Sequence, residues 1–362
     1  MGEAGAHALV REGQTGPGDD SVLVSASIFG CAGTTLSTEE RAFFRDARPW
    51  GFILFTRNCE NPDQVRRLTA SLRESVARDA PIFIDQEGGR VARLKPPHWR
   101  VSPPAAQFGA LFRDTEEGAR EATYLNARLI ASELIDLGIN ADCMPCLDVP
   151  MAGAHDIIGD RAFDRDARTV IELGRAFAEG LLDGGVLPVA KHIPGHGRAG
   201  ADSHEALPVV DAPHEELSRT DFVTFRGLNT LPMAMTAHVV YSALDAQRCA
   251  TLSPRIIHTV IRGEIGFQGL LMSDDLGMKA LAGSFSERAR LALNAGCDVV
   301  LHCNGNLDEM KSVMEGTRKL AAEAAERADA ALACLRKAAP VDIDGMEKRI
   351  ARIMSERQVE SA

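Results

Sequence analysis

Residues 285–304, FSERARLALNAGCDVVLHCN, hold one complete helix-to-strand unit of the kind that decides this fold. Residues 285–296 place apolar side chains at helical spacing, with polar residues between them and a glycine at the end. The run DVVLHCN (298–304) follows at once and is continuously apolar in its middle. Such a run is typical of a strand that is covered on both faces, and a helix leading into it indicates a parallel sheet.

Runs of the same kind recur along the chain, and they indicate eight strands in about 280 residues. They are SASIFGC (25–31), WGFILF (50–55), PIFID (81–85), INADCMPCLDV (139–149), GVLPVAKH (185–192), PMAMTAHVV (232–240), GLLMSDD (269–275) and DVVLHCN (298–304). Most are separated by segments of helical periodicity without a central proline, such as 63–79, 116–138 and 170–185. The pattern predicts an α/β protein, a single (β/α)8 TIM-like barrel. A doubly wound open sheet is the alternative, because a strand count from sequence is approximate.

No linker rich in Pro, Gly or Ser divides the chain, and we expect one folded domain. We predict a loose N-terminal arm (1–20), the barrel (21–340) and a C-terminal helical tail packed on the barrel or trailing from it (341–362). The segment from Leu307 is rich in Ala, Glu, Lys and Arg. It predicts helix that closes the last βα unit and packs outside the barrel.

Composition narrows the classes of partner and compartment. The 362 residues are 45% hydrophobic and 25% charged, as in ordinary globular proteins, and the formal net charge is -11. This charge disfavours nucleic acid as a partner. The N-terminus has no apolar secretory core, and no run approaches the roughly 20 apolar residues of a membrane span. We therefore expect a cytoplasmic protein without a membrane partner. We also expect a monomer.

The eight cysteines are scattered, and most lie in apolar runs. This distribution predicts buried, reduced thiols rather than disulfides. Cys143 and Cys146 form one CxxC, but no second pair follows at zinc-ribbon spacing. We expect no metal and no cofactor.

Polar residues gather where the predicted strands end. In a parallel barrel the carboxyl ends of all strands face the active site. Scattered surface charge would not select strand ends, so this placement favours an enzyme. The residues concerned are Asp85, Lys191, His192, His238, Asp274, Asp275, His302 and Asn304.

The stretch after the fifth strand, KHIPGHGRAGADSHEALPVVD (191–211), admits three interpretations. GHGRAG (195–200) fits the dinucleotide pattern G-x-G-x-x-G, but no helical periodicity follows it and Pro208 comes soon after. His192, His196, Asp202 and His204 could gather around a metal, although their spacing matches no helical HxxxH face.

The third interpretation is acid/base catalysis by His204. Asp202 lies two residues earlier and can hydrogen-bond the imidazole, which orients the ring and favours its protonated form. From the local sequence alone, a turn capped by Asp202 is an equal alternative.

Asp274 and Asp275 end the apolar run LLMSDD. Adjacent side chains on a strand point to opposite faces, so one carboxylate can face the barrel mouth while the other makes structural bonds. Adjacent acids before a helix also act as caps, and this alternative stays open for the pair alone.

Taken together, these stretches resemble glycoside hydrolase family 3, in particular its bacterial β-N-acetylglucosaminidase (NagZ-type) branch. The signature is KHIPGHGRAGADSH, which resembles K-H-[FI]-P-G-H-G-x4-D-S-H. FIDQEGGRVARL, IIGDRAF, LMSDDLGM and GSFSERARLALNAGCDVVLHCN agree with the branch in order and spacing. The resemblance runs from about Ser25 to Asn304.

The resemblance implies a single barrel and a role for each matching residue. Asp274 would be the nucleophile, and His204 would be the general acid/base, assisted by Asp202. The sugar contacts that it implies are Asp85, Arg93, Arg161, Lys191 and His192. Asp275 is expected to support the site or cap a helix, His196 to support the loop, and His238 to lie in the core.

The activity that the resemblance implies is retaining, metal-independent exo-hydrolysis of terminal β-linked GlcNAc. The implied substrates are GlcNAc-anhydroMurNAc muropeptides of peptidoglycan recycling. A β-N-acetylglucosaminide phosphorylase remains an alternative. Its acceptor would be phosphate in place of water, and a neutral imidazole does not repel this anion. A non-catalytic sugar-binding barrel is a third possibility, and a β-glucosidase a fourth. The stretch 147–166 departs from the common V-D-x-N-x-N-P-x-I-G-x-R-S-F at Pro150, Met151, Ala152 and Ala162, so substrate preference at the rim stays open.

Overall fold

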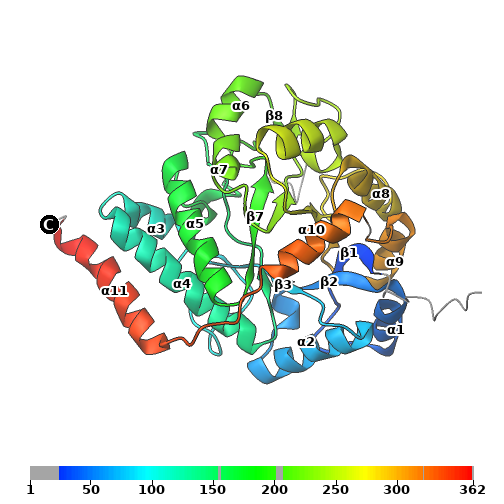
Figure 1. The fold of residues 1–362 in the computed structure, drawn as a ribbon, viewed down its shortest axis with the longest axis horizontal. Helices are drawn as coiled ribbons and strands as arrows, with labels where there is room; N and C mark the ends of the chain where they lie inside the picture. The colour runs from blue at the N-terminus through cyan, green and yellow to red at the C-terminus, as the bar shows by residue number, and fades with distance from the viewer. Residues whose placement is uncertain (1–23, 154–155, 201–206, 321, 361–362) are drawn as a thin grey trace, which may run out of the picture.

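The computed structural model describes residues 24–153, 156–200, 207–320 and 322–360, and within them eight parallel strands close into a barrel (Figure 1). The barrel strands, in chain order, are β1 (Ser25–Phe29), β2 (Pro49–Leu54), β3 (Ile82–Ile84), β6 (Ala141–Asp142), β7 (Leu187–Ile193), β9 (Met233–Thr236), β11 (Leu270–Asp275) and β12 (Val299–His302). Each pairs with its neighbour in the chain order, and β12 pairs with β1 to close the circle. The predicted (β/α)8 barrel is therefore confirmed, and the open-sheet alternative is wrong.

Every predicted strand overlaps an observed one, but the fourth observed strand is much shorter than its apolar run. The predicted run 139–149 forms only β6 as a regular strand. Pro145 lacks an N–H and interrupts the ladder, as proline does inside sheets. The segment still lies beside β7, because the N–H of Leu147 donates to the carbonyl of Lys191.

The outer helices follow the predicted periodicity and begin at side-chain caps. The ends of the helices differ from those of the predicted segments by no more than three residues. These helices are α2 (Pro62–Val76), α4 (Glu116–Asp136), α5 (Ala167–Asp183) and α8 (Phe285–Ala295). Each cap side chain accepts a backbone N–H of the first turn, as N-cap residues do. The caps are Asn61, Thr115, Asp166 and Ser284. α1 (Thr38–Ala47) begins with a capping box between Ser37 and Glu40.

The C-terminal part is less regular than a single run of helix. α9 (Leu307–Gly316) completes the last unit, but residues 317–320 then lie antiparallel to the start of β1. There the N–H of Ala26 donates to Arg318, and the N–H of Leu320 donates to Val24. Pairing with an open strand end thus overrides local helix propensity in this segment.

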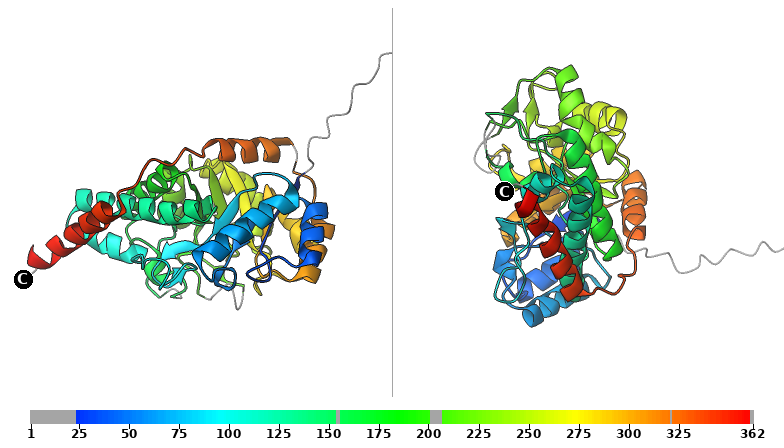
Figure 2. Two further views of the ribbon diagram at one scale, coloured as in Figure 1. Left: turned by 90° about the horizontal axis from the view of Figure 1, so that it is seen from below. Right: turned by 90° about the vertical axis from the view of Figure 1, so that its left-hand side faces the viewer.

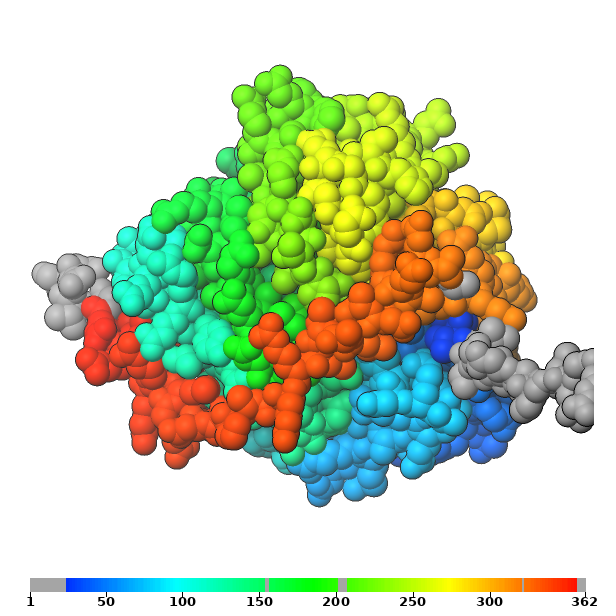
Figure 3. All heavy atoms as spheres, viewed as in Figure 1, coloured from blue at the N-terminus to red at the C-terminus, as the bar shows by residue number. Residues whose placement is uncertain are grey.

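Two further helices follow and lie outside the barrel. α10 (Ala322–Ala333) packs near the start of β11, where Arg327 binds Asp298 at 2.9 Å. α11 (Ile343–Glu360) packs on α4 through two bonds from Arg349 to Glu121. The two helices and the extended segment that connects them form a continuous band across one face of the molecule (Figures 2 and 3). The predicted domain boundaries stay a prediction, and the arm (1–20) lies outside the described residues.

The described helices include none that is both long and apolar enough to cross a membrane.

Candidate active site

A cavity of ≈440 Å³ opens at the carboxyl ends of the barrel strands, and this volume suits a small ligand. Its walls come from segments that are far apart in the sequence. The residues predicted from the strand ends and motifs that line it are Asp85, Arg93, Arg161, Lys191, His192, His196, Asp274, Asp275 and Asn304. The barrel therefore brings the five predicted sugar contacts and the predicted nucleophile to one cavity. Asp202 and His204 lie outside the described residues.

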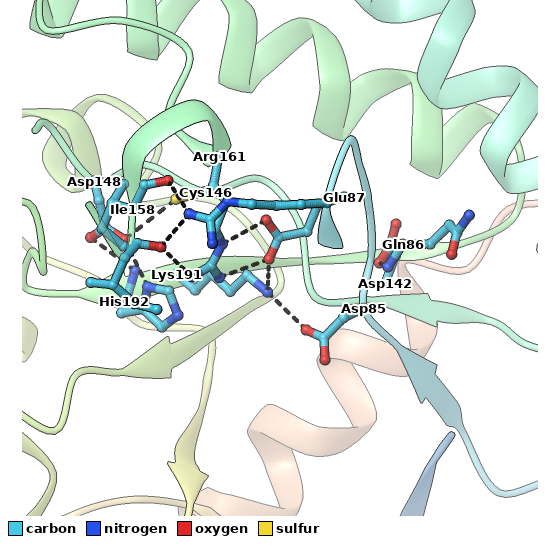
Figure 4. A network of polar contacts seen from close by, with 12 residues as sticks. Asp85, Gln86, Glu87, Asp142, Cys146, Asp148, Ile158, Arg161, Lys191 and His192 are labelled. Atoms are coloured by element: carbon cyan, nitrogen blue, oxygen red, sulfur yellow. Dashed lines mark hydrogen bonds and ion pairs between the residues drawn. The ribbon is translucent and has the colours of Figure 1, made fainter. Parts of the chain in front are cut away.

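Lys191 is the centre of a chain of buried ion pairs (Figure 4). The residue is 2% exposed, and its Nζ lies 2.8 Å from Asp85 Oδ1 and 2.6 Å from Glu87 Oε1. Arg93 Nη2 lies 2.9 Å from the other oxygen of Asp85. Arg161 binds both oxygens of Glu87, from Nη2 at 2.8 Å and from Nε at 2.9 Å. Cations and carboxylates thus alternate along the floor of the cavity.

The alternation keeps every group in this chain charged. Burial raises the pKa of a carboxyl group, but Lys191 and Arg161 outweigh burial at Glu87 and hold its pKa at about 2. Burial acts in the same way on Asp85, yet Lys191 and Arg93 hold the pKa of Asp85 well below its usual range. Burial lowers the pKa of Lys191, but the two carboxylates raise it above its ordinary value. The cavity therefore presents fixed charges that can form strong hydrogen bonds to hydroxyl groups.

The turn that carries Asp85 and Arg93 explains the paired glycines of DQEGGR. β4 (Gln86–Gly88) and β5 (Val91–Ala92) form a short hairpin. Gly88 has φ 95°, and a Cβ there would lie 2.3 Å from the carbonyl oxygen of Pro103. Only glycine fits this position without strain. The side chain of Gln86 accepts the N–H groups of Arg93 and Leu94, which fixes Arg93 beside the cavity.

A second buried carboxylate orients His192. Asp148 Oδ2 lies 2.7 Å from His192 Nδ1, and its Oδ1 accepts the N–H groups of His192 and His196. Burial opposes the ionised form of Asp148, but its contact with His192 and the bonds to Oδ1 keep its pKa well below the usual range. An ionised Asp148 accepts the Nδ1 proton, so the ring is held with a defined tautomer and direction. Burial and the nearby His192 lower the pKa of His196 to about 4, which keeps it neutral.

Exchanging Asp148 for asparagine tests this orientation. Asp148→Asn removes the acceptor of the His192 Nδ1 proton. We expect kcat/KM to fall at least tenfold, because the same exchange of the aspartate in a Ser-His-Asp triad greatly lowers the rate. The matched control is Asp142→Asn, an equally buried acid whose pKa burial raises to about 7. The control should keep nearly full activity and its pH profile. Equal losses in the two variants would point to a general structural effect instead.

The two acids that end β11 differ in their bonds. Asp275 Oδ1 accepts the N–H groups of Gly277 and Cys303, and its carbonyl oxygen lies 3.0 Å from His238 Nε2. These contacts tie the end of β11 to the end of β12. Asp274 lies in the cavity wall, with Oδ1 2.7 Å from the N–H of Asp275. His238 is fully buried and does not line the cavity, which agrees with the expected place in the core.

Two residues of the site escaped the sequence analysis, namely Glu87 and Asp148. Glu87 lies two residues after Asp85, within a motif that was otherwise assigned to Asp85 and Arg93. Asp148 is the second-last residue of the fourth apolar run, and so shows the same signal that identified Asp85. A search for acids at the ends of apolar runs would have found Asp148, whereas Glu87 carries no such signal.

Comparison with known proteins places the whole barrel in one family. Residues 23–335 match the family described as the Glycosyl hydrolase family 3 N terminal domain. The chain is 41% identical over 287 residues to a beta-hexosaminidase of Alkalilimnicola ehrlichii, which covers 78% of this chain and 82% of that protein. The crystal structure of native NagZ from Neisseria gonorrhoeae matches with a TM-score of 0.81 and 30% identity, over 92% of this chain and 98% of that chain. The complex of the same NagZ with N-trifluoroacetyl-D-glucosamine matches with a TM-score of 0.82 and 30% identity over the same shares. The resemblance read from the motifs is thereby confirmed, and the chain belongs to glycosyl hydrolase family 3.

Proposed function

We propose that this protein is a retaining exo-β-N-acetylglucosaminidase, an enzyme of the β-hexosaminidase type. The observation that carries the proposal is one cavity in which Asp274 lies with the buried charges of Asp85, Lys191, Arg93 and Arg161. Beta-hexosaminidase relatives that align with about three quarters of the chain support the same activity.

The chemistry follows from the placement of these groups. Asp274 attacks the anomeric carbon and forms a glycosyl-enzyme intermediate, and water then releases the sugar with retention. The sugar hydroxyls bind the charged groups of Asp85, Lys191 and Arg93. His204, assisted by Asp202, protonates the leaving oxygen and later activates water. We also propose that no metal or cofactor takes part in these steps.

The proposed substrates are muropeptides in which a terminal GlcNAc is β-linked to anhydroMurNAc. We propose that the enzyme removes this GlcNAc during peptidoglycan recycling. We also propose that it acts in the cytoplasm and as a monomer. The relative from Neisseria gonorrhoeae that was solved with an N-acyl glucosamine supports an amino sugar in the cavity. The cavity of ≈440 Å³ is in the size range of small-molecule sites and can hold the terminal sugar.

The test is hydrolysis of p-nitrophenyl β-GlcNAc by the full chain, with and without phosphate and with and without EDTA. We expect release that is indifferent to both additions, with β-GlcNAc as the first product seen by NMR. Strong stimulation by phosphate with formation of GlcNAc-1-phosphate would make the protein a phosphorylase. No release by the folded protein would favour a sugar-binding barrel, and faster release from the β-glucoside would favour the glucosidase alternative.

A further inference from the structure

Behind the cavity wall, three different metal-binding side chains converge on one point (Figure 4). Cys146 Sγ lies 3.4 Å from Asp148 Oδ2, and His192 Nδ1 lies 2.7 Å from the same oxygen. All three ligand atoms lie within 4.8 Å of one another, and the residues are buried. Thiolate, imidazole and carboxylate together are a donor set that suits zinc and similar cations.

One of the three distances between ligand atoms already matches that around a coordinated cation. Zinc binds sulfur at about 2.3 Å and nitrogen or oxygen at about 2.0 Å, so neighbouring ligand atoms in a tetrahedron lie about 3.3–3.6 Å apart. The Sγ to Oδ2 distance of 3.4 Å already falls in that interval. The Nδ1 to Oδ2 distance of 2.7 Å is a hydrogen bond, and it would lengthen once a cation replaces the proton.

The carboxylate that would bridge this set is already held in place. Asp148 Oδ1 accepts the backbone N–H groups of His192 at 3.2 Å and His196 at 2.7 Å. These two bonds orient Oδ2 toward Cys146 and His192, as outer hydrogen bonds orient metal ligands in proteins. The nearby positive charge of Arg161 is itself balanced by the two bonds to Glu87. His192 lines the cavity and so gives a cation a route to the site.

We propose that Cys146, Asp148 and His192 form a site for a thiophilic divalent cation such as Zn²⁺, whose binding inhibits the enzyme. Coordination bonds form from Sγ, Oδ2 and Nδ1 to the cation, which gives up water in return. The Cys146 thiol releases one proton to solvent, and the His192 proton is held on Nε2 instead of Nδ1. No oxidant or reductant is needed. The site thus carries two negative ligands against one doubly charged cation.

Inhibition follows from the loss of the Asp148–His192 hydrogen bond. In the cation-free protein that bond orients the ring that lines the cavity. A coordinated His192 is shifted and presents a fixed N–H toward the substrate. The binding of the cation is independent of the proposed function, and only the inhibition depends on it.

The first test is titration of the full chain with Co²⁺, followed by the near-ultraviolet absorption of cobalt–thiolate charge transfer. We expect one band for the wild type and no band for Cys146→Ser, which preserves a donor to Asp148 but removes the thiolate. The matched controls are Cys143→Ala, a buried thiol on the same segment, and Cys303→Ala, a thiol in the cavity wall. Both controls should keep the band.

Two results would overturn the proposal. A wild type that gives no thiolate band has no such site, whatever the variants do. A band that survives in Cys146→Ser and disappears in Cys303→Ala places the cation against Asp274 and Asp275 instead. If Cys146→Ser does not fold, Cys146→Ala is measured in the same way.

The second test is inhibition by Zn²⁺, with each variant's activity expressed relative to its own metal-free rate. Loss of a ligand should raise the half-inhibiting Zn²⁺ concentration at least about tenfold in Cys146→Ser, because even losing a hydrogen-bonding partner of a ligand costs that much. Cys143→Ala should resemble the wild type. Equal sensitivity of Cys146→Ser and the wild type would contradict the proposal.

Discussion

Replacing Asp274 by alanine is expected to lower kcat for GlcNAc release at least ~10³-fold, because the variant has no nucleophile for the first displacement. The barrel should still fold, since the bonds of Asp275 that join β11 to β12 are untouched. Steady-state kinetics with p-nitrophenyl β-GlcNAc measures the loss, and circular dichroism checks the fold.

Rescue by azide separates a missing nucleophile from a damaged site. In Asp274→Ala a small anion can enter the vacated space and attack the anomeric carbon from the same face. The expected product is the α-glycosyl azide, which NMR distinguishes from its β isomer. Full activity of the variant without azide would contradict the assignment of Asp274.

The exchange Glu87→Gln is expected to cost about 3–5 kcal/mol of unfolding free energy at pH 7, the range for breaking a buried ion pair. Glutamine has the shape of the protonated acid, but it leaves Arg161 without its carboxylate and Lys191 with Asp85 alone. We also expect kcat/KM to fall, because Glu87 fixes two of the proposed sugar contacts. Thermal or urea unfolding and steady-state kinetics measure the two effects.

The effect of Glu87→Gln on stability should depend on pH in a defined direction. The pKa of Glu87 is lowered to about 2 in the folded protein, from an ordinary value of about 4.3. Its stabilising contribution is therefore complete above the ordinary value and is lost as the pH falls toward 2. The difference in unfolding free energy between wild type and variant should shrink from pH 5 downward.

An exposed ion pair provides the control for Glu87. Glu116 binds Arg168 through two bonds of 2.8 and 2.7 Å, so this pair is bidentate like that of Glu87 with Arg161, but it lies at the surface. Glu116→Gln should cost less than about 1 kcal/mol. A similar cost for both exchanges would contradict the buried network as the source of the effect.

The barrel could be predicted from sequence because each strand is buried on both faces and each is followed by a helix or a long loop. β2, for example, is buried along its whole length, which is why WGFILF is a continuous apolar run. The segment after Gly316 could not be predicted in the same way. Its composition favours helix, and only pairing with the start of β1, distant in sequence, draws it into an extended form.

The cavity could be predicted residue by residue where a motif or a strand end marked it, as for Asp85, Lys191 and Asp274. The partner that each of these side chains binds could not be predicted. Nothing in the sequence says that Arg161 binds Glu87 rather than a sugar alone, or that Asp148 holds His192, because these pairs join segments that meet only in the closed barrel.

The central claim is that Asp274 becomes covalently bonded to the sugar. The most direct test is rapid acid quench of the wild type during turnover of an activated β-GlcNAc glycoside, followed by mass spectrometry of its peptides. We predict one added N-acetylglucosaminyl group on the peptide that contains Asp274, absent in Asp274→Ala. An adduct on another residue, or an inverted product with no adduct, would contradict the account.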